Sequence, residues 1–206
     1  MILLIGVAAG LLSGLLRATL NKKPYQPYSL RLVWLVLFAV AAQWFAFSFP
    51  LTRASLSETA IRLTLVLSQL MLLVFVVGNR KTPGFWLLGL GLVLNLTVIV
   101  LNGGLMPVTP ETVNWLMPNS QVDSWQIGER LGYGKDVVLP RGDTILWFLS
   151  DQIRTPSWLP VRVAFSLGDI FIALGAFWLF WSIGGRAKST SLQEKYHVTT
   201  DLPPNN

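Results

Sequence analysis

Two aspartates are the residues of this sequence best placed to do chemistry. Asp151 lies in a long polar stretch, and Asp169 follows eighteen residues later, just inside the next apolar run. Two carboxyl groups that share one proton have well-separated pKa values, so one of them can activate a water molecule. The pair therefore predicts acid–base hydrolysis, provided that the fold brings both side chains within reach of the same water.

A layer of polar side chains within the apolar runs is the second candidate site. Its members are Gln43, Gln69, Asn95 and Asp169. At a rise of ~1.5 Å per helical residue, all four lie roughly 10–14 Å from the same end of their helices. Amide side chains at one depth favour hydrogen bonds between helices. A carboxylate there costs at least ~2.5 kcal/mol to bury, which leaves Asp169 open between that role and a functional acid.

Other kinds of site are excluded by composition. The sequence has no cysteine and one histidine, His197, in the polar C-terminal tail. Disulfides, thiol nucleophiles and iron–sulfur clusters are therefore excluded, and no histidine is available for a haem or a Ser/His/Asp triad. Gly132-Tyr133-Gly134-Lys135 lacks the flanking residues of a phosphate loop. The sequence predicts neither a metal site nor a cofactor.

The residues that position these groups are strongly apolar. The chain is 52% hydrophobic and 13% charged, whereas soluble domains have about 25% charged residues. Its apolar runs approach the ~20 residues that a helix needs to cross a bilayer. We expect an all-α integral membrane protein with one membrane domain, residues 1–185, and about five transmembrane helices. The expected spans are residues 2–20, 30–49, 60–78, 84–101 and 161–183.

Basic residues indicate the orientation of these spans. They cluster at Lys22-Lys23, at Arg80-Lys81 and in the polar tail, residues 186–206. Such residues prefer the cytoplasm. We therefore expect an inner (plasma) membrane protein with its N-terminus outside and its tail in the cytoplasm. The net charge of +6 is interpreted as this topology signal, and no nucleic-acid partner is predicted.

Between the fourth and fifth spans, residues 105–160 are predicted to form a partly helical cap on the outer face. Thr109-Pro110-Glu111 has the residue types of a helix N-terminus and predicts a short helix to about Met117. Asp143 predicts the N-cap of a second helix over residues 144–151. In the first span, Gly6, Gly10 and Gly14 form a groove for a close helix contact, within the chain in preference to a partner.

Two motifs carry a family resemblance. One is Asn102-Gly103-Gly104 followed by Pro107, and the other is the glycine–aspartate motif around Asp169. With the segment between them, they resemble an uncharacterised bacterial family of small integral membrane proteins, domain of unknown function 5317. The resemblance covers most of the chain and implies a five-helix membrane fold without an assigned activity.

A second, partial resemblance is to lipoprotein signal peptidase, a membrane aspartyl protease. It rests on Phe165-Ser166-Leu167-Gly168-Asp169, which is similar to that family's Phe-Asn-x-Ala-Asp motif. The asparagine and alanine of the motif are Ser166 and Gly168 here, and the order of motifs along the chain also differs. This resemblance implies catalytic roles for Asp151 and Asp169.

The features together favour a non-enzymatic structural or accessory subunit of a membrane protein complex. The expected partners are the lipid bilayer and other membrane protein subunits. A membrane-embedded aspartyl hydrolase is the alternative, and a small transporter, suggested by the polar layer, is the third hypothesis.

Overall fold

The structure is a computed structural model that describes residues 2–22, 24–118 and 125–184. The predicted polar tail at residues 186–206, with His197, lies outside the described residues. Helices dominate the described chain, and two of them, α1 and α4, are long and apolar enough to cross a membrane. The five long helices are α1 (Ile2–Leu20), α2 (Val33–Phe47), α4 (Glu58–Gly78), α5 (Phe85–Leu101) and α7 (Leu167–Ile183).

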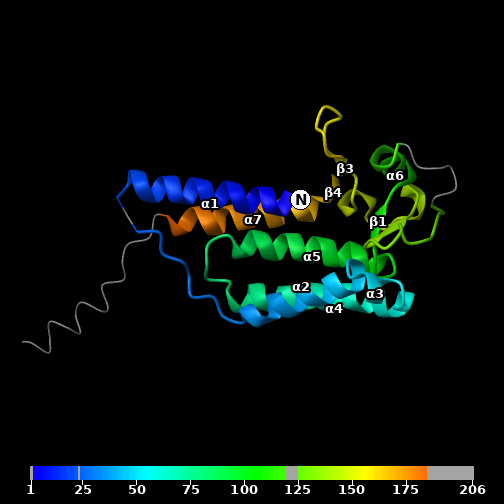
Figure 1. The fold of residues 1–206 in the computed structure, drawn as a ribbon, viewed down its shortest axis with the longest axis horizontal. Coiled ribbons are helices and arrows are strands. Elements are labelled where there is room, and N and C mark those ends of the chain that lie inside the picture. The colour runs from blue at the N-terminus through cyan, green and yellow to red at the C-terminus, as the bar shows by residue number, and fades with distance from the viewer. Residues whose placement is uncertain (1, 23, 119–124, 185–206) are drawn as a thin grey trace, which may run out of the picture.

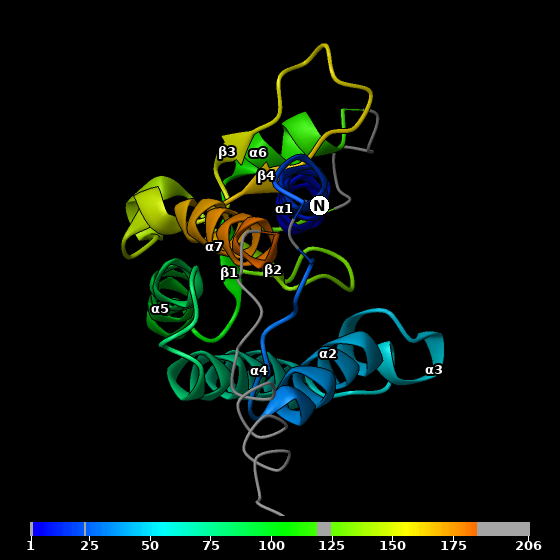
Figure 2. The same cartoon turned by 90° about the vertical axis from the view of Figure 1, so that its left-hand side faces the viewer.

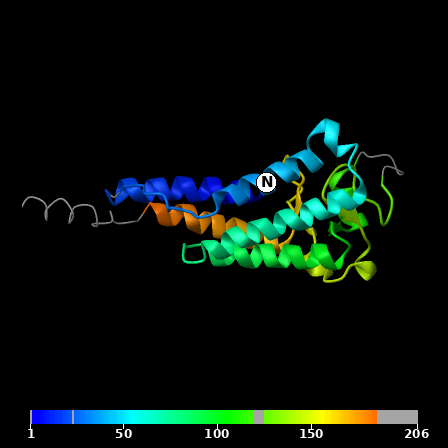
Figure 3. The same ribbon diagram turned by 90° about the horizontal axis from the view of Figure 1, so that it is seen from below.

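The long helices pack side by side in an order that differs from their order in the sequence. α1 packs on α7, α7 on α5, α5 on α4, and α4 on α2. Figure 1 shows the helices running alongside one another, with the remaining elements gathered beyond one end of the bundle. In Figure 2, which looks along the helices, α1 and α2 lie at opposite ends of this row. Figure 3 shows the same side-by-side packing from below.

The contact between α1 and α7 is made through the glycines of the first helix. Gly6, Gly10 and Gly14 lie against the α7 backbone at Ala173, Phe177 and Phe180. A Cβ atom at Gly10 would lie 2.6 Å from the carbonyl oxygen of Phe177, closer than two such atoms can approach. Only glycine therefore allows this separation of the helix axes. The glycine groove is filled within the chain.

The cap, residues 105–160, is built from short elements and includes strands that the sequence did not predict. Strand β1 (Met106–Val108) pairs in parallel with β2 (Asp136–Val138), and β3 (Ile153–Arg154) pairs antiparallel with β4 (Ala164–Phe165). Helix α6 (Pro110–Leu116) begins as expected, because the Thr109 side chain accepts a hydrogen bond from the Thr112 amide. A further short helix, α3 (Pro50–Arg53), follows α2.

The helix expected after Asp143 is absent, and this prediction was wrong. Two 3₁₀ turns stand there instead, η1 (Arg141–Asp143) and η2 (Trp147–Leu149). Thr144 is extended, and Leu146 has a left-handed φ of 55°, so a continuous α-helix cannot form. The Asn102 side chain bonds both the amide and the carbonyl of Ile145, which holds this segment in its extended form.

The fifth long helix begins later than expected, at Leu167 and not at Val161. Ser166 and Asp169 form a capping box, in which each side chain bonds the backbone amide of the other residue. The preceding residues Ala164 and Phe165 are already engaged in β4. The apolar run therefore contains a strand and then a helix, and hydropathy does not distinguish them.

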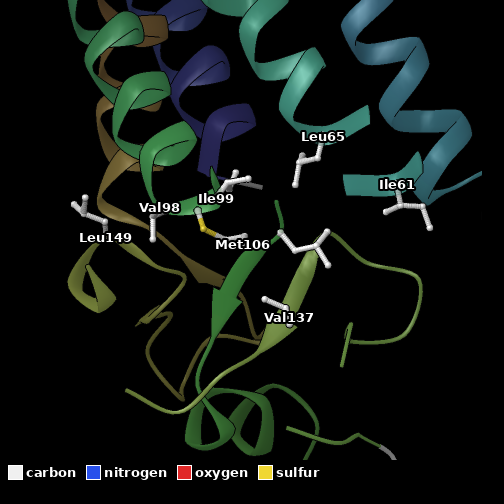
Figure 4. Packing of buried hydrophobic residues seen from close by; sticks show 8 residues of the cluster. Ile61, Leu65, Val98, Ile99, Met106, Val137 and Leu149 are labelled. Carbon is white, nitrogen blue, oxygen red and sulfur yellow. The ribbon is translucent and has the colours of Figure 1, made fainter. Parts of the chain in front are cut away.

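A hydrophobic cluster fixes the cap to the ends of the helices. Figure 4 shows Ile61 and Leu65 of α4, Val98 and Ile99 of α5, and Met106, Val137 and Leu149 of the cap packed together. Met106 is only 1% exposed and Val137 only 3%. The cap is thus continuous with the core of the helices, which holds its polar residues at defined positions above them.

Candidate functional site

A cavity of about 250 Å³ lies where the helices meet the cap. Its polar walls come from α2, α4, α5, α7 and the loop before β2. They are formed by Gln43, Gln69, Asn95, Asp169 and Lys135. The four residues placed at one depth by counting along the sequence thus line one cavity, and Lys135 joins them from the cap. The remaining walls are apolar and include Ile2, Leu3, Leu65, Leu72, Leu92 and Ile172.

Asp169 is held by hydrogen bonds on both of its carboxylate oxygens. Oδ1 accepts from the Asn95 side-chain amide at 2.9 Å, and Oδ2 accepts from the Ser166 backbone amide at 3.1 Å. The Ser166 hydroxyl in turn donates to Asn95 Oδ1 at 2.8 Å. Ser166 and Asn95 are buried. This network fixes the start of α7 against α5 and orients the carboxylate at the cavity wall.

The two glutamines differ in how their polar groups are satisfied. Gln43 donates to the Ser68 hydroxyl at 2.7 Å, which links α2 to α4. Gln69 Oε1 is buried and has no hydrogen-bond partner in the described protein. A buried acceptor left without a donor costs about 1–3 kcal/mol. The Gln69 carbonyl is therefore an acceptor that a bound molecule would satisfy.

A lysine and two aspartates form an ion-pair cluster at the cap side of the cavity. Lys135 Nζ lies 2.6 Å from Asp151 Oδ2 and 3.0 Å from Asp136 Oδ1. Both ends of the closer pair are positioned by β1, because the Met106 amide donates to the Lys135 carbonyl and the Asp151 amide donates to the Pro107 carbonyl. Asp151 is 5% exposed, and its Oδ1 has no partner in the described protein.

Burial raises the pKa of Asp151 to about 7. Lys135 opposes this rise, whereas the negative charges of Asp136 and Asp169 add to it. Burial alone would lower the pKa of Lys135, but Asp136 and Asp151 outweigh it and raise that pKa well above its usual value. One ammonium therefore faces three carboxyl groups, and the raised pKa places the proton exchange of Asp151 near neutral pH.

The arrangement of the two aspartates differs from a shared-proton dyad. No hydrogen bond joins the Asp151 and Asp169 carboxyl groups in the described chain. Asp151 Oδ2 bonds Lys135, and both Asp169 oxygens bond other groups. Asp169 still acts on Asp151 electrostatically, since its charge raises the pKa of Asp151. The two residues belong to one site, with Lys135 as the direct partner of Asp151.

The Asn102-Gly103-Gly104 motif supports the site from outside the cavity. Gly103 and Gly104 have left-handed φ values of 83° and 92°, which turn the chain sharply from α5 into β1. Arg62 of α4 donates to the Gly103 carbonyl at 2.6 Å. Pro107 lies in β1, where its carbonyl accepts from Asp151. The motif therefore places the strand that holds both Lys135 and Asp151.

Three site residues, Ser166, Lys135 and Asp136, had not been identified from the sequence. Ser166 belongs to a Ser-x-x-Asp pattern that is a recognisable capping box, so this signal was present. Lys135 had no comparable signal, because its contact with Asp151 depends on the tertiary pairing of β1 and β2. Among the described residues, no group of three or more His, Cys, Asp or Glu side chains is arranged to hold a metal ion.

Comparisons with known proteins place the chain in a family. A family model described as a family of unknown function (DUF5317) matches residues 27–181. An uncharacterized protein of Thermotoga maritima is 32% identical over 125 residues, which cover 55% of this chain and 60% of that protein. No solved structure matches the chain. Because the family model matches well over half of the sequence, the chain belongs to the family of unknown function DUF5317.

Proposed function

We propose that this protein is an integral membrane protein that binds the polar end of an amphiphilic molecule in the cavity beneath the cap. The observation that carries the proposal is the convergence of five polar side chains on one cavity, in which the Gln69 carbonyl lacks a partner. Such a site, mostly apolar with a few convergent polar groups, is the usual form of a small-molecule pocket.

The distribution of charge supports a membrane orientation. At the end of the helices away from the cap, the described charged residues are all basic: Arg17, Lys22, Arg31, Arg80 and Lys81. The cap end holds all the described acidic residues, together with Arg53, Arg62, Arg130, Lys135, Arg141, Arg154 and Arg162. The positive-inside rule counts Lys and Arg in short connections, so the connections that hold Lys22, Arg31, Arg80 and Lys81 favour the cytoplasm for this end and an outward-facing cap. Exposed apolar side chains along the helices, such as Leu4, Leu12 and Leu37, suit lipid contact.

We further propose that all five long helices span the bilayer, with the N-terminus outside. α2, α5 and α7 have 15 to 17 residues, at or below the lower limit of the ~17–25 usual for a spanning helix. They pack alongside α1 and α4, which are long enough on their own. Packing in one row with these two helices supports a common transmembrane direction.

The charges of the site indicate which polar group it would bind. Among the residues that the structure describes, Lys135 is the single cation beside Asp136, Asp151 and Asp169, so an additional anion is disfavoured. A hydroxyl, amide or ammonium group would satisfy the Gln69 carbonyl and face the carboxylates. The apolar walls would accept a hydrocarbon chain. Its route is the open side of the helix row between α1 and α2, since both of these helices contribute to the cavity wall.

The other hypotheses have less support. The glycine groove of α1 offers no contact surface to a partner subunit, because α7 fills it. A hydrolase that uses Asp151 and Asp169 would need a shared proton, whereas Lys135, Asn95 and Ser166 are their bonded partners. Binding of an amphiphile requires no change in the hydrogen bonds that Asp151 and Asp169 already make.

Thermal stability of the full-length protein in mild detergent tests the binding proposal. Three probes of one chain length are compared: monoolein with hydroxyl groups, oleylamine with an ammonium group, and oleate with a carboxylate. We expect monoolein and oleylamine to raise the Tm by several degrees, and oleate to leave it unchanged. Gln69→Phe, which fills the cavity, should abolish the increase. Leu67→Phe, at a half-exposed position of the same helix, should retain it.

Equal stabilisation by all three probes, or an unchanged response in Gln69→Phe, would remove the basis for this site. The orientation is tested separately, because the chain has no native cysteine. A membrane-impermeant maleimide should label Asn114→Cys in the cap of intact cells and leave Lys81→Cys unlabelled. The reverse pattern would contradict the topology.

A further inference from the structure

A groove on the surface of the helices is separate from the polar cavity and lies at the opposite end. It has a volume of about 380 Å³ and runs between α4 and α5. Its walls include Leu73, Val76 and Val77 from α4, and Leu90 and Val93 from α5. Gly89 forms part of its floor, since a Cβ atom there would lie 3.1 Å from Val76 Cγ1. The groove is therefore a narrow apolar channel open to the side of the bundle.

Basic residues surround the end of this groove away from the cap. Arg80 lines the groove and also two adjoining hollows, which have volumes of about 410 and 590 Å³. Lys81 lines both of these hollows, and Arg31 lines the first. None of the residues that line the three hollows is acidic. An apolar channel thus ends in a cluster of positive charge.

The cluster is held in place, but its charges are not paired. The Asn79 side chain accepts from the Arg31 amide and donates to the Arg31 carbonyl, each at 2.8 Å, which fixes Arg31 beside the end of α4. Within the described chain, Arg31, Arg80 and Lys81 make no salt bridge. Trp86 is 76% exposed where the groove meets one of the hollows. An exposed tryptophan beside basic residues is typical of a membrane–water interface.

We propose that this groove binds an anionic phospholipid of the cytoplasmic leaflet. The phosphate lies among Arg31, Arg80 and Lys81, and one acyl chain occupies the channel between α4 and α5. Charge complementarity identifies the occupant, because basic pockets at the cytoplasmic ends of transmembrane helices attract anionic headgroups. The site rests on the membrane orientation proposed above but is independent of the cavity and its ligand.

Native mass spectrometry of the full-length protein, with phosphatidylglycerol and phosphatidylcholine of identical chains as probes, tests this site. Wild-type protein should retain phosphatidylglycerol in preference. Each basic residue near the surface contributes about a fivefold gain in binding, so the double variant Arg80→Gln/Lys81→Gln should bind phosphatidylglycerol about 25-fold more weakly. The matched control Arg17→Gln/Lys22→Gln removes the same charge from the same end and should bind as wild type does.

Two further measurements test the acyl-chain channel and distinguish a lipid headgroup from free phosphate. Gly89→Leu, which fills the channel, should weaken binding of both lipids, whereas inorganic phosphate should not displace bound lipid. Loss of binding to the same extent in both double variants, or no preference for phosphatidylglycerol in wild type, would overturn the proposal. The monoolein response of Arg80→Gln/Lys81→Gln, measured in parallel, reports on the cavity, so failure of one site is distinguishable from failure of the other.

Discussion

Replacing Asp151 by asparagine should change how the stability of the protein depends on pH. Asp151 is buried, and its pKa is raised from the ordinary 3.8 to about 7. Between these two values the folded protein holds a proton at Asp151 that the unfolded chain has released. The protonated Asp151 carboxyl therefore contributes its full amount to the free energy of unfolding below about pH 4. This contribution decreases as the pH rises and is lost once the pH has passed through about 7.

The size of the effect follows from the two pKa values. Stability falls by about 1.4 kcal/mol for each pH unit while the folded state binds one proton more than the unfolded state. Between pH 5 and pH 8 the total loss is about 2–3 kcal/mol. For a chain of this length, that loss corresponds to a decrease of about 5–10 °C in Tm. Lys135 does not contribute to the change in stability between pH 5 and pH 8, because it is protonated in both the folded and the unfolded state.

The assay is thermal unfolding of the purified full-length protein in detergent at pH 5, 6, 7 and 8. Wild type should lose Tm steadily across this series, and Asp151→Asn should remove most of that decline. Histidine is the side chain whose ordinary pKa lies near neutral pH, so the single histidine of the chain, His197, serves as the control. If Asp151 causes the decline, His197→Gln should show the same decline as wild type. If Asp151→Asn keeps the full wild-type slope, the raised pKa of Asp151 is refuted as the cause of the decline.

Two further predictions concern the contacts that hold the helices and the site. Gly10→Leu should separate α1 from α7 and lower the Tm strongly, because its Cβ would lie 2.6 Å from the Phe177 carbonyl oxygen. The control Leu12→Phe, on the exposed face of the same helix, should have little effect on the Tm. An equal loss of Tm in both variants would contradict the packing of α1 on α7. Asn95→Leu should cost about 1–3 kcal/mol, seen as a lower Tm, because Asp169 loses a buried donor and the Ser166 hydroxyl loses its acceptor. A variant as stable as wild type would show that this network does not stabilise α7.

Much of the helical arrangement was accessible from the sequence because it depends on local hydropathy. Long apolar runs produced α1 and α4 at nearly the expected residues. The four polar residues could be picked out as a group because they stand inside apolar runs, and Gln43, Gln69, Asn95 and Asp169 line one cavity. The depth counted for Asp169 does not hold, because α7 begins six residues later than expected and Asp169 lies in its first turn.

The cap was much less accessible, because its structure is determined by contacts between distant residues. The parallel pairing of β1 with β2 joins segments thirty residues apart, with no hairpin turn to indicate it. Lys135 reaches Asp151 only through that pairing. Likewise, the helix expected after Asp143 was overridden by the Asn102 side chain, which bonds Ile145 from the end of α5.

The packing of α1 on α7 has a consequence for the synthesis and folding of the chain. The helix that covers the glycine face of α1, α7, is completed about 160 residues after α1 itself. At the usual rate of about 5–20 residues per second, the first helix waits roughly 10–30 s without its partner. A chain that stops within that interval leaves the glycine face of α1 unfilled, with its backbone open to other helices. The packing of α1 therefore depends on the synthesis of α7.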